Sequence, residues 1–440
     1  MKMLKKLFAI LILALLATLT ATAQEVVLDV SVTSPVLLAE QSQTTYLRVG
    51  LTGFALDDGY PRPPVNVAIV LDRSGSMDGE KIARAKEAAR MAVGLLGPAD
   101  IVSIITYSDT VEILVPATRV GNSGYIRERI DSIYADGSTA LFAGVSKGAD
   151  ELRKFFAPDL VNRVILLSDG LANVGPDSPA ALGELGQVLR KSGISVTTIG
   201  LGLGYNEDLM VRLAEKSDGN HAFVENSRDL ARIFEFEFED ILSVVAQDVE
   251  IEITCGNGVR PIRIIGRESE IIGSNVITTV NQLYSNQEKY VVLEVEVESH
   301  DVGTQINLAN VRLRYDNMVT SSRDILTGGV SAEFSASQEQ VEQSVDRPAM
   351  TAAVLQLATE RSEEAVRLRD EGRVEEAQAE LRANSLFLQE QAAQLDSDEL
   401  AGYGAAMAES AESVEDDAEW NSTRKQMVDD QYENKSQQSY

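Results

Sequence analysis

Cysteine, histidine and tryptophan are scarce in this chain, whose 440 residues include one Cys, two His and one Trp. The single cysteine, Cys255, excludes an intramolecular disulfide framework and any zinc site built from cysteines. Its thiol has two alternative roles, a bond to another molecule or a small buried apolar group. His221 and His300 are too few for a histidine-rich metal site, and neither lies in a catalytic motif.

Long apolar runs are also lacking, apart from residues 7–19 at the N-terminus. Lysines precede this run and small residues follow it, which is typical of a signal peptide. These flanking residues are Lys2, Lys5, Lys6, Ala21 and Ala23. We expect cleavage of 1–23, a mature protein from Gln24 without an integral membrane span, and export to the periplasm, the cell surface or the medium. A membrane anchor is the alternative, although a span needs about 20 apolar residues.

Positive charge is in short supply, since 39 Lys and Arg face 68 Asp and Glu and the formal net charge is −29. Such a field repels phosphate backbones, so nucleic acid is not an expected partner. The acidic residues are concentrated in 396–440, where twelve of them accompany three basic residues. This composition predicts a solvated, flexible acidic tail.

Short apolar runs alternate with amphipathic helical stretches over 65–245, which predicts a doubly wound, mostly parallel α/β sheet of Rossmann-like type. The expected strands are 65–71, 101–107, 111–117, 163–167, 195–201 and 222–225. The expected helices are 81–96, 124–134, 141–156, 179–191, 207–216 and 227–242.

Period-two alternation marks the flanking segments, 24–64 before this domain and 246–330 after it. Val291, Leu293 and Val295, for example, alternate with Glu294 and Glu296. Two N-terminal strands alone are marginally stable, so we expect them to join the later strands in one antiparallel β-sandwich.

The C-terminal part is expected to contain a linker over 331–347, a helical hairpin over 348–395 and the acidic tail over 396–440. Gly372 would end the first helix of the hairpin and let the chain reverse. Residues 364–381 resemble one tetratricopeptide-type unit, and a plain hairpin packed on the body is the alternative.

Three short motifs lie in predicted loops of the α/β domain, and the first and third directly follow strands, where open sheets place their ligand sites. They are Asp72-Arg73-Ser74-Gly75-Ser76, Asp136-Gly137-Ser138-Thr139 and Ser168-Asp169-Gly170. In this order they resemble the metal-ion-dependent adhesion site of von Willebrand factor type A domains. The resemblance covers about 180 residues and implies a metal site formed by Asp72, Ser74, Ser76, Thr139 and Asp169. It also implies capture of a carboxylate from a partner protein.

The residue types of these motifs suit Mg²⁺, with Mn²⁺ or Ca²⁺ as alternatives, because hard cations prefer oxygen ligands and Mg²⁺ is usually held by one or two carboxylates. The two aspartates would neutralise the dication, and the hydroxyls would add ligands without charge. The alternative for a single motif is helix capping by Ser76 or Asp78. Gly200, Gly202 and Gly204 imitate a dinucleotide fingerprint, but their spacing differs from it.

The wider layout is similar to bacterial relatives of calcium-activated chloride channel regulators and of inter-α-trypsin inhibitor heavy chains. The expected function is therefore a non-enzymatic, metal-dependent protein-binding module. Two further hypotheses are an assembly factor of the cell envelope, acting through the hairpin and tail, and a metal-dependent hydrolase. The sequence argues against the hydrolase, because it contains no His-Glu-x-x-His motif and no candidate base beside the metal motifs.

Overall fold

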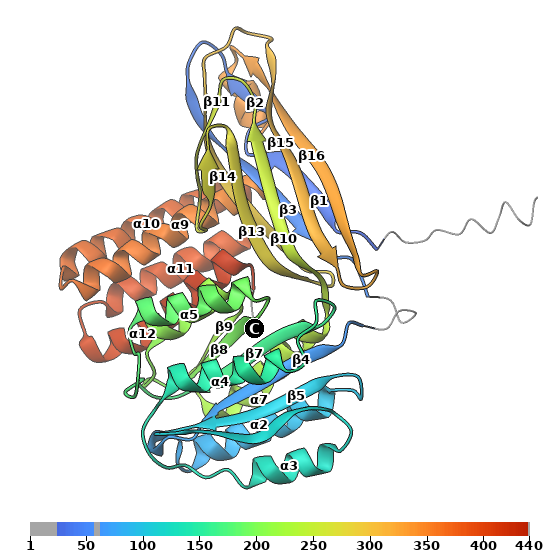
Figure 1. The fold of residues 1–440 in the computed structure, drawn as a ribbon. Coiled ribbons are helices and arrows are strands. Elements are labelled where there is room, and N and C mark those ends of the chain that lie inside the picture. Colours follow the sequence, from blue (N-terminus) through green and yellow to red (C-terminus); the bar gives the residue numbers. More distant parts are fainter. Residues whose placement is uncertain (1–23, 57–61, 439–440) are drawn as a thin grey trace, which may run out of the picture.

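The chain forms three regions in the computed structural model, which describes residues 24–56 and 62–438 (Figure 1). An α/β domain occupies 65–242, and strands from both sides of it in the sequence form a β-sandwich. A helical region completes the chain. The predicted signal peptide, 1–23, lies outside the described residues.

The α/β domain is built on a six-stranded sheet of order β6-β5-β4-β7-β8-β9. Only the β5–β6 pair is antiparallel in this sheet. Its central strands are buried along their whole length, which explains their continuous apolar sequences. The strands are β4 (Val65–Asp72), β5 (Ile101–Tyr107), β6 (Val111–Arg119), β7 (Val161–Ser168), β8 (Ser195–Leu201) and β9 (His221–Val224).

Helices cover both faces of this sheet, so the predicted doubly wound fold is confirmed. One face packs against α2 (Glu80–Leu95), α3 (Ser123–Asp131) and α7 (Leu230–Leu242). The other face packs against α4 (Leu141–Arg153), α5 (Pro179–Lys191) and α6 (Glu207–Ser217). Two short 3₁₀ turns, η1 (Gly75–Met77) and η2 (Ser227–Asp229), precede α2 and α7.

The β-sandwich combines strands that precede the α/β domain with strands that follow it. The first sheet has the order β1-β3-β14-β11 and the second β12-β13-β10-β15-β16-β2, with one apolar core between them. The early strands are β1 (Val27–Val32), β2 (Val36–Leu38) and β3 (Gln43–Thr52). The later strands are β10 (Val244–Cys255), β11 (Val259–Ile264), β12 (Glu270–Ile272), β13 (Asn275–Tyr284), β14 (Glu288–Val297), β15 (Gln305–Asn317) and β16 (Ser322–Ser335).

Two expectations for the C-terminal part are wrong. The supposed linker contains the end of β16, with Ala332 and Phe334 buried in the sandwich, and a short helix α8 (Gln338–Gln343). The supposed flexible tail is helical and packs on the predicted hairpin because its apolar side chains, among them Met407 and Trp420, are buried. The helices are α9 (Arg347–Asp370), α10 (Val374–Leu395), α11 (Asp398–Ser413) and α12 (Asp417–Ser436).

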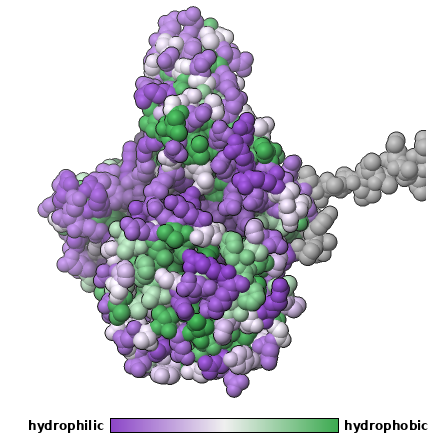
Figure 2. Space-filling view, in the orientation of Figure 1, coloured by the Kyte–Doolittle hydropathy of each residue, from purple (hydrophilic) through white to green (hydrophobic). Residues whose placement is uncertain are grey.

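Acidic composition and helical packing coexist in this helical region because most charged side chains lie outside, although Lys425 and Asp429 are buried. Figure 2 shows a mostly hydrophilic surface over it, at the left of the view. Helix α12 lies against the α/β domain, where the Asp429 carboxylate accepts a hydrogen bond from the main-chain N–H of Phe223 at 3.0 Å. No helix in 24–56 or 62–438 is long and apolar enough to cross a membrane.

Candidate metal centre

Two aspartates meet at the carboxyl edge of the central sheet. Asp72 is the last residue of β4, and Asp169 directly follows β7. Since β4 and β7 are parallel neighbours with Leu71 opposite Leu167, their ends lie side by side. Both aspartates are buried, with 0% and 1% of their surfaces exposed. The fold thus places two carboxylates close together at a sheet edge.

The loop after β4 directs its serines toward the same point. The Ser74 main-chain N–H donates to Asp72 Oδ1 at 2.8 Å. The hydroxyl oxygens of Ser74 and Ser76 lie 3.0 Å apart, and Ser76 Oγ donates to Asp169 Oδ1 at 2.7 Å. The second oxygen of Asp72 accepts a hydrogen bond from Ser168 at 2.8 Å. The first and third motifs are therefore connected directly.

The loop before α4 brings Thr139 beside these groups. Its Gly137 carbonyl accepts a hydrogen bond from the Gly75 N–H at 2.9 Å, which ties the two loops together. A Cβ atom placed on Gly170 would lie 3.3 Å from Ser76 Oγ and 3.4 Å from Thr139 Oγ1, so both hydroxyls border the same glycine. All five predicted site residues are thus gathered at one place.

Thr139 has an unbonded hydroxyl and Ser76 is exposed, and both features suit the binding of a metal ion. Within the described residues, the Thr139 hydroxyl makes no hydrogen bond to the protein, although its main-chain N–H donates to Asn173 Oδ1 at 2.8 Å. Ser76 is exposed, whereas Ser74 and Thr139 are buried. The gathered oxygens therefore have a buried side toward the sheet and an open side toward solvent.

The electrostatics of the centre favour a bound cation. Burial raises the pKa of Asp72 above its usual range, and the neighbouring charge of Asp169 raises it further, while hydrogen bonds from Ser74 and Ser168 act in the opposite direction. Burial and the Asp72 charge also hold the pKa of the Tyr107 hydroxyl well above its usual value. A nearby positive charge would stabilise both carboxylates in their ionised form.

Lys81 supplies one such charge and was not identified by motif spacing. Its ammonium nitrogen lies 2.5 Å from Asp169 Oδ2, and its side chain remains 35% exposed. Lys81 stands in the first turn of α2, directly after the serine loop, and this proximity in sequence is the signal that could have found it. Asp169 therefore already has one cationic partner.

The oxygen donors fit a small hard cation such as Mg²⁺. Two carboxylates and three hydroxyls match its preference for oxygen ligands and for few carboxylates. No cluster of three or more His, Cys, Asp or Glu that could hold a metal occurs in the described part of the chain. The donor set here is of another kind, because hydroxyl oxygens form its majority.

Other sequence features lie away from this chemistry or at its rim. His221 is buried in β9, and His300 stacks near Phe334 in the sandwich. A Cβ on Gly200 would collide with the Tyr205 ring, so that glycine permits close packing. Two exposed apolar side chains lie next to the metal motifs in the sequence. Tyr134, just before the second motif, is 68% exposed, and Leu171, just after the third, is 59% exposed.

Comparison with known proteins places the α/β domain in a family. The family model of the von Willebrand factor type A domain matches residues 66–236. The uncharacterized protein YfbK of Escherichia coli is 31% identical over 193 residues, which cover 43% of this chain and 34% of that protein. The uncharacterized protein sll0103 of Synechocystis is 26% identical over 64% of this chain and 68% of its own length.

A further relative bears out the expected similarity to inhibitor heavy chains. Inter-alpha-trypsin inhibitor heavy chain H3 of Rattus norvegicus is 26% identical over 45% of this chain and 23% of that protein. This chain thus spans about a third of the E. coli relative and about a quarter of the rat protein.

Solved structures extend the likeness of fold beyond this domain. A von Willebrand factor type A protein from Catenulispora acidiphila has a TM-score of 0.69 at 16% identity, covering 89% of this chain and 90% of its own. The ArnB paralog VWA2 from Sulfolobus acidocaldarius has a TM-score of 0.62 at 18% identity, covering 94% and 98%. This chain therefore contains a region, residues 66–236, that matches the von Willebrand factor type A domain.

Proposed function

We propose that this protein is an exported, non-enzymatic binding module that holds one divalent cation and uses it to capture a carboxylate of a partner protein. Asp72, Ser74, Ser76, Thr139 and Asp169 would hold the ion, with Mg²⁺ as the first choice and Mn²⁺ or Ca²⁺ as alternatives. The carrying observation is that side chains from three loops meet: Ser76 and Thr139 border Gly170, and Ser76 also contacts Ser74 and Asp169.

The charges of the centre explain why a carboxylate is the expected ligand. Asp72 and Asp169 balance a dication, and the hydroxyls add no charge, so a bound ion keeps its attraction for a further anionic oxygen. The ion would supply Lewis acidity at an open coordination position. Ser76 is exposed and lies on the side from which a partner approaches.

The surroundings of the centre argue against hydrolysis. A hydrolase needs a base to accept a proton from the attacking water. Tyr107 is fully buried, its hydroxyl donates to the Leu167 carbonyl at 3.0 Å, and its pKa is raised, so it keeps its proton. Lys81 is paired with Asp169, and both histidines lie elsewhere. These contacts favour binding over water activation.

A peptide selection tests the proposal. Random peptides displayed on phage would be selected on the mature protein in Mg²⁺ and eluted with a chelator. We expect the eluted peptides to share an Asp or Glu whose Asn or Gln replacement abolishes binding, and we expect Thr139→Ala to lose them. Peptides that bind equally with chelator, or equally to Thr139→Ala, would overturn metal-dependent capture. Ser138→Ala, from the same loop, is the matched control.

A further inference from the structure

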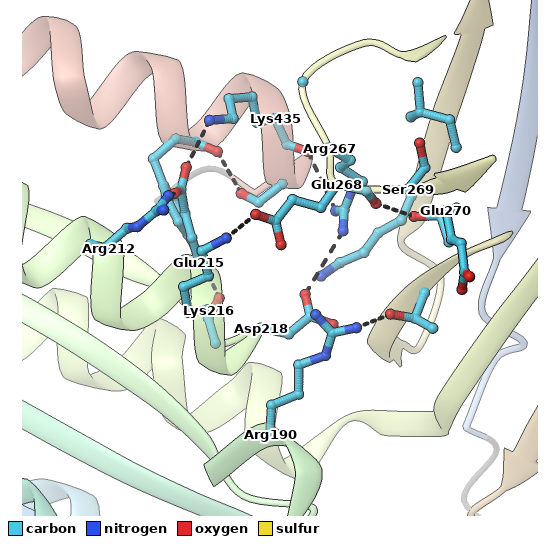
Figure 3. A pocket seen from close by; sticks show the side chains of 18 of the residues that line it. Arg190, Arg212, Glu215, Lys216, Asp218, Arg267, Glu268, Ser269, Glu270 and Lys435 are labelled. Carbon is cyan, nitrogen blue, oxygen red and sulfur yellow. Dashed lines mark hydrogen bonds and ion pairs between the residues drawn. The ribbon is translucent and has the colours of Figure 1, made fainter. Parts of the chain in front are cut away.

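A second polar site lies far from the metal loops, where the three regions of the chain meet. A pocket of about 860 Å³ is lined by α5 and α6 of the α/β domain, by the β11–β12 segment and β13 and β14 of the sandwich, and by α9 and α12 (Figure 3). Its volume lies within the range of about 300–1,000 Å³ that is usual for small-molecule sites. Charged side chains from all three regions point into it.

Most charges around this pocket are already paired. The Lys435 ammonium lies 2.7 Å from Glu215 and 2.8 Å from Glu363. Lys216 pairs with Glu268. Arg267 faces Asp218 across a looser gap of 3.8 Å. These pairs form the walls of the pocket and leave a smaller set of charges for a ligand.

Lys289 is the first of these charges that has no ion pair among the described residues. It lines the pocket from β14, is 6% exposed, and forms no hydrogen bond or ion pair with any described residue. Its ammonium lies 5.0 Å from the centre of the Tyr284 ring. Burial lowers its pKa to about 8, and the charge of Arg267 lowers it too. A buried ammonium is costly unless an anion compensates it.

Arg190 is the second such charge. Its guanidinium donates to the Thr279 hydroxyl and forms no ion pair with the described part of the chain. Figure 3 shows Arg190 and Arg267 approaching Asp218 from opposite sides. Asp218 pairs with Arg267 and also acts on Lys289, as does Asp240, but neither Arg190 nor Lys289 has a carboxylate in ion-pair contact among the described residues. Glu270, which also forms no ion pair with a described residue, lies on the exposed strand β12.

We propose that this pocket binds a phosphate group, as inorganic phosphate or as the monoester of a small polar molecule, between Arg190, Arg267 and Lys289. A dianion could pair with Lys289 and Arg190, which have no ion pair among the described residues, and guanidinium groups bind phosphate oxygens through paired N–H donors. Asp218 lines the same pocket, so the remaining proton of the inorganic dianion HPO₄²⁻ can be donated to this carboxylate, whereas sulfate and a monoester dianion have no proton to donate. The net charge of −29 weakens binding of an anion only slightly, because salt screens exposed charges that lie more than about 8–10 Å away.

Titration calorimetry of sodium phosphate into the mature protein tests this site. A chelator in the buffer keeps the separate metal centre out of the measurement. We expect one binding site, weaker binding of sodium sulfate, and at least a tenfold loss of phosphate affinity in Lys289→Met and in Arg190→Gln. Arg312→Gln is the matched control, because Arg312 pairs with Glu252 on a distant face of the sandwich, and we expect it to bind as the wild type does.

The remaining outcomes decide against the proposal. No phosphate binding by the folded wild type would overturn it, as would unchanged affinity in both variants or equal affinity for sulfate. If Lys289→Met does not fold, as judged by circular dichroism, Arg190→Gln decides alone. Glycerol phosphate separates the two sources of the group: tighter binding than inorganic phosphate assigns a monoester, and weaker binding assigns the free ion.

Discussion

Lys81 stands where it would compete with the proposed metal ion for Asp169. Its ammonium contacts the carboxylate that would neutralise the ion, so this pairing would weaken on binding of a dication. We expect Lys81→Met to raise Mn²⁺ affinity about three- to tenfold, since a partly exposed ion pair contributes roughly 1 kcal/mol. Calorimetry on metal-stripped protein measures the change. Lys86→Met on the same helix should leave it unaltered, and weaker binding by Lys81→Met would contradict this role of the lysine.

His221 makes the folded state sensitive to acid. The side chain is fully buried beside Thr198, and burial lowers its pKa to about 3. Between the ordinary value of about 6.5 and this lowered value, the unfolded chain binds a proton that the folded chain does not. The free energy of unfolding therefore falls as the pH drops through this window, by up to about 1.4 kcal/mol per pH unit.

The variant His221→Phe isolates this contribution. Urea unfolding at pH 7 and pH 5 should show the wild type losing about 2 kcal/mol more than the variant over that interval. Any constant cost of the substitution cancels in this difference. Equal losses in the two proteins would mean that His221 is protonated in the folded state.

Residue spacing predicts which side chains form the candidate metal centre, but it does not predict how their charges are balanced. Asp72, Ser74 and Ser76 occupy one short loop, and the register of β4 and β7 brings Asp169 to them, so sequence order suffices to group them. Lys81 was missed because its contact depends on the direction of α2 and on its rotamer. The pocket around Lys289 was missed for a stronger reason: its lining comes from three regions whose packing leaves no local pattern.

At the level of helices, acidic composition led to the wrong prediction for α11 and α12. Trp420, Met427 and Tyr432 of α12 are buried without forming a regular apolar stripe, since Lys425 and Asp429 are buried among them. Net charge alone predicted disorder, because it does not record which face the charges occupy. Burial of these side chains, together with the Arg424 ion pairs to Glu207 and Asp208, ties the helix to the body.

Trp420 gives a direct measure of this packing. It is 6% exposed and lies 5.8 Å from the Arg369 guanidinium. We expect Trp420→Ala to lower the free energy of unfolding by about 3–5 kcal/mol in urea titrations, as for other buried aromatic side chains. Leu386→Ala, whose side chain in α10 is 68% exposed, should change it by less than about 0.5 kcal/mol. A Trp420→Ala effect that small would indicate a loose tail.

On the scale of the whole molecule, a polar core joins the α/β domain to the sandwich. Arg163 in β7 is fully buried, contacts Glu237 of α7 at 3.7 Å, and donates to the Tyr284 hydroxyl of β13 at 3.0 Å. Separating the two regions would leave this guanidinium without its sandwich partner. Both regions were predicted from the sequence, but their connection was not, because it depends on the contact of Arg163 in β7 with Tyr284 in β13.

Scanning calorimetry tests that connection. Because a buried charge is shared across the boundary, we expect the α/β domain and the sandwich to unfold in one transition, with calorimetric and van't Hoff enthalpies that agree. Two resolved transitions would show that the regions unfold independently and that Arg163 contributes little to their coupling.

Titration calorimetry of Mg²⁺, Mn²⁺ and Ca²⁺ into metal-stripped protein from Gln24 tests the proposed metal site most directly. Thr139→Ala is the informative variant, because its hydroxyl makes no hydrogen bond among the described residues and its loss should leave the fold intact. We expect one site in the wild type and in Ser138→Ala, and at least a tenfold loss of affinity in Thr139→Ala. No binding by the wild type, or equal binding by Thr139→Ala, would contradict a metal site at these residues.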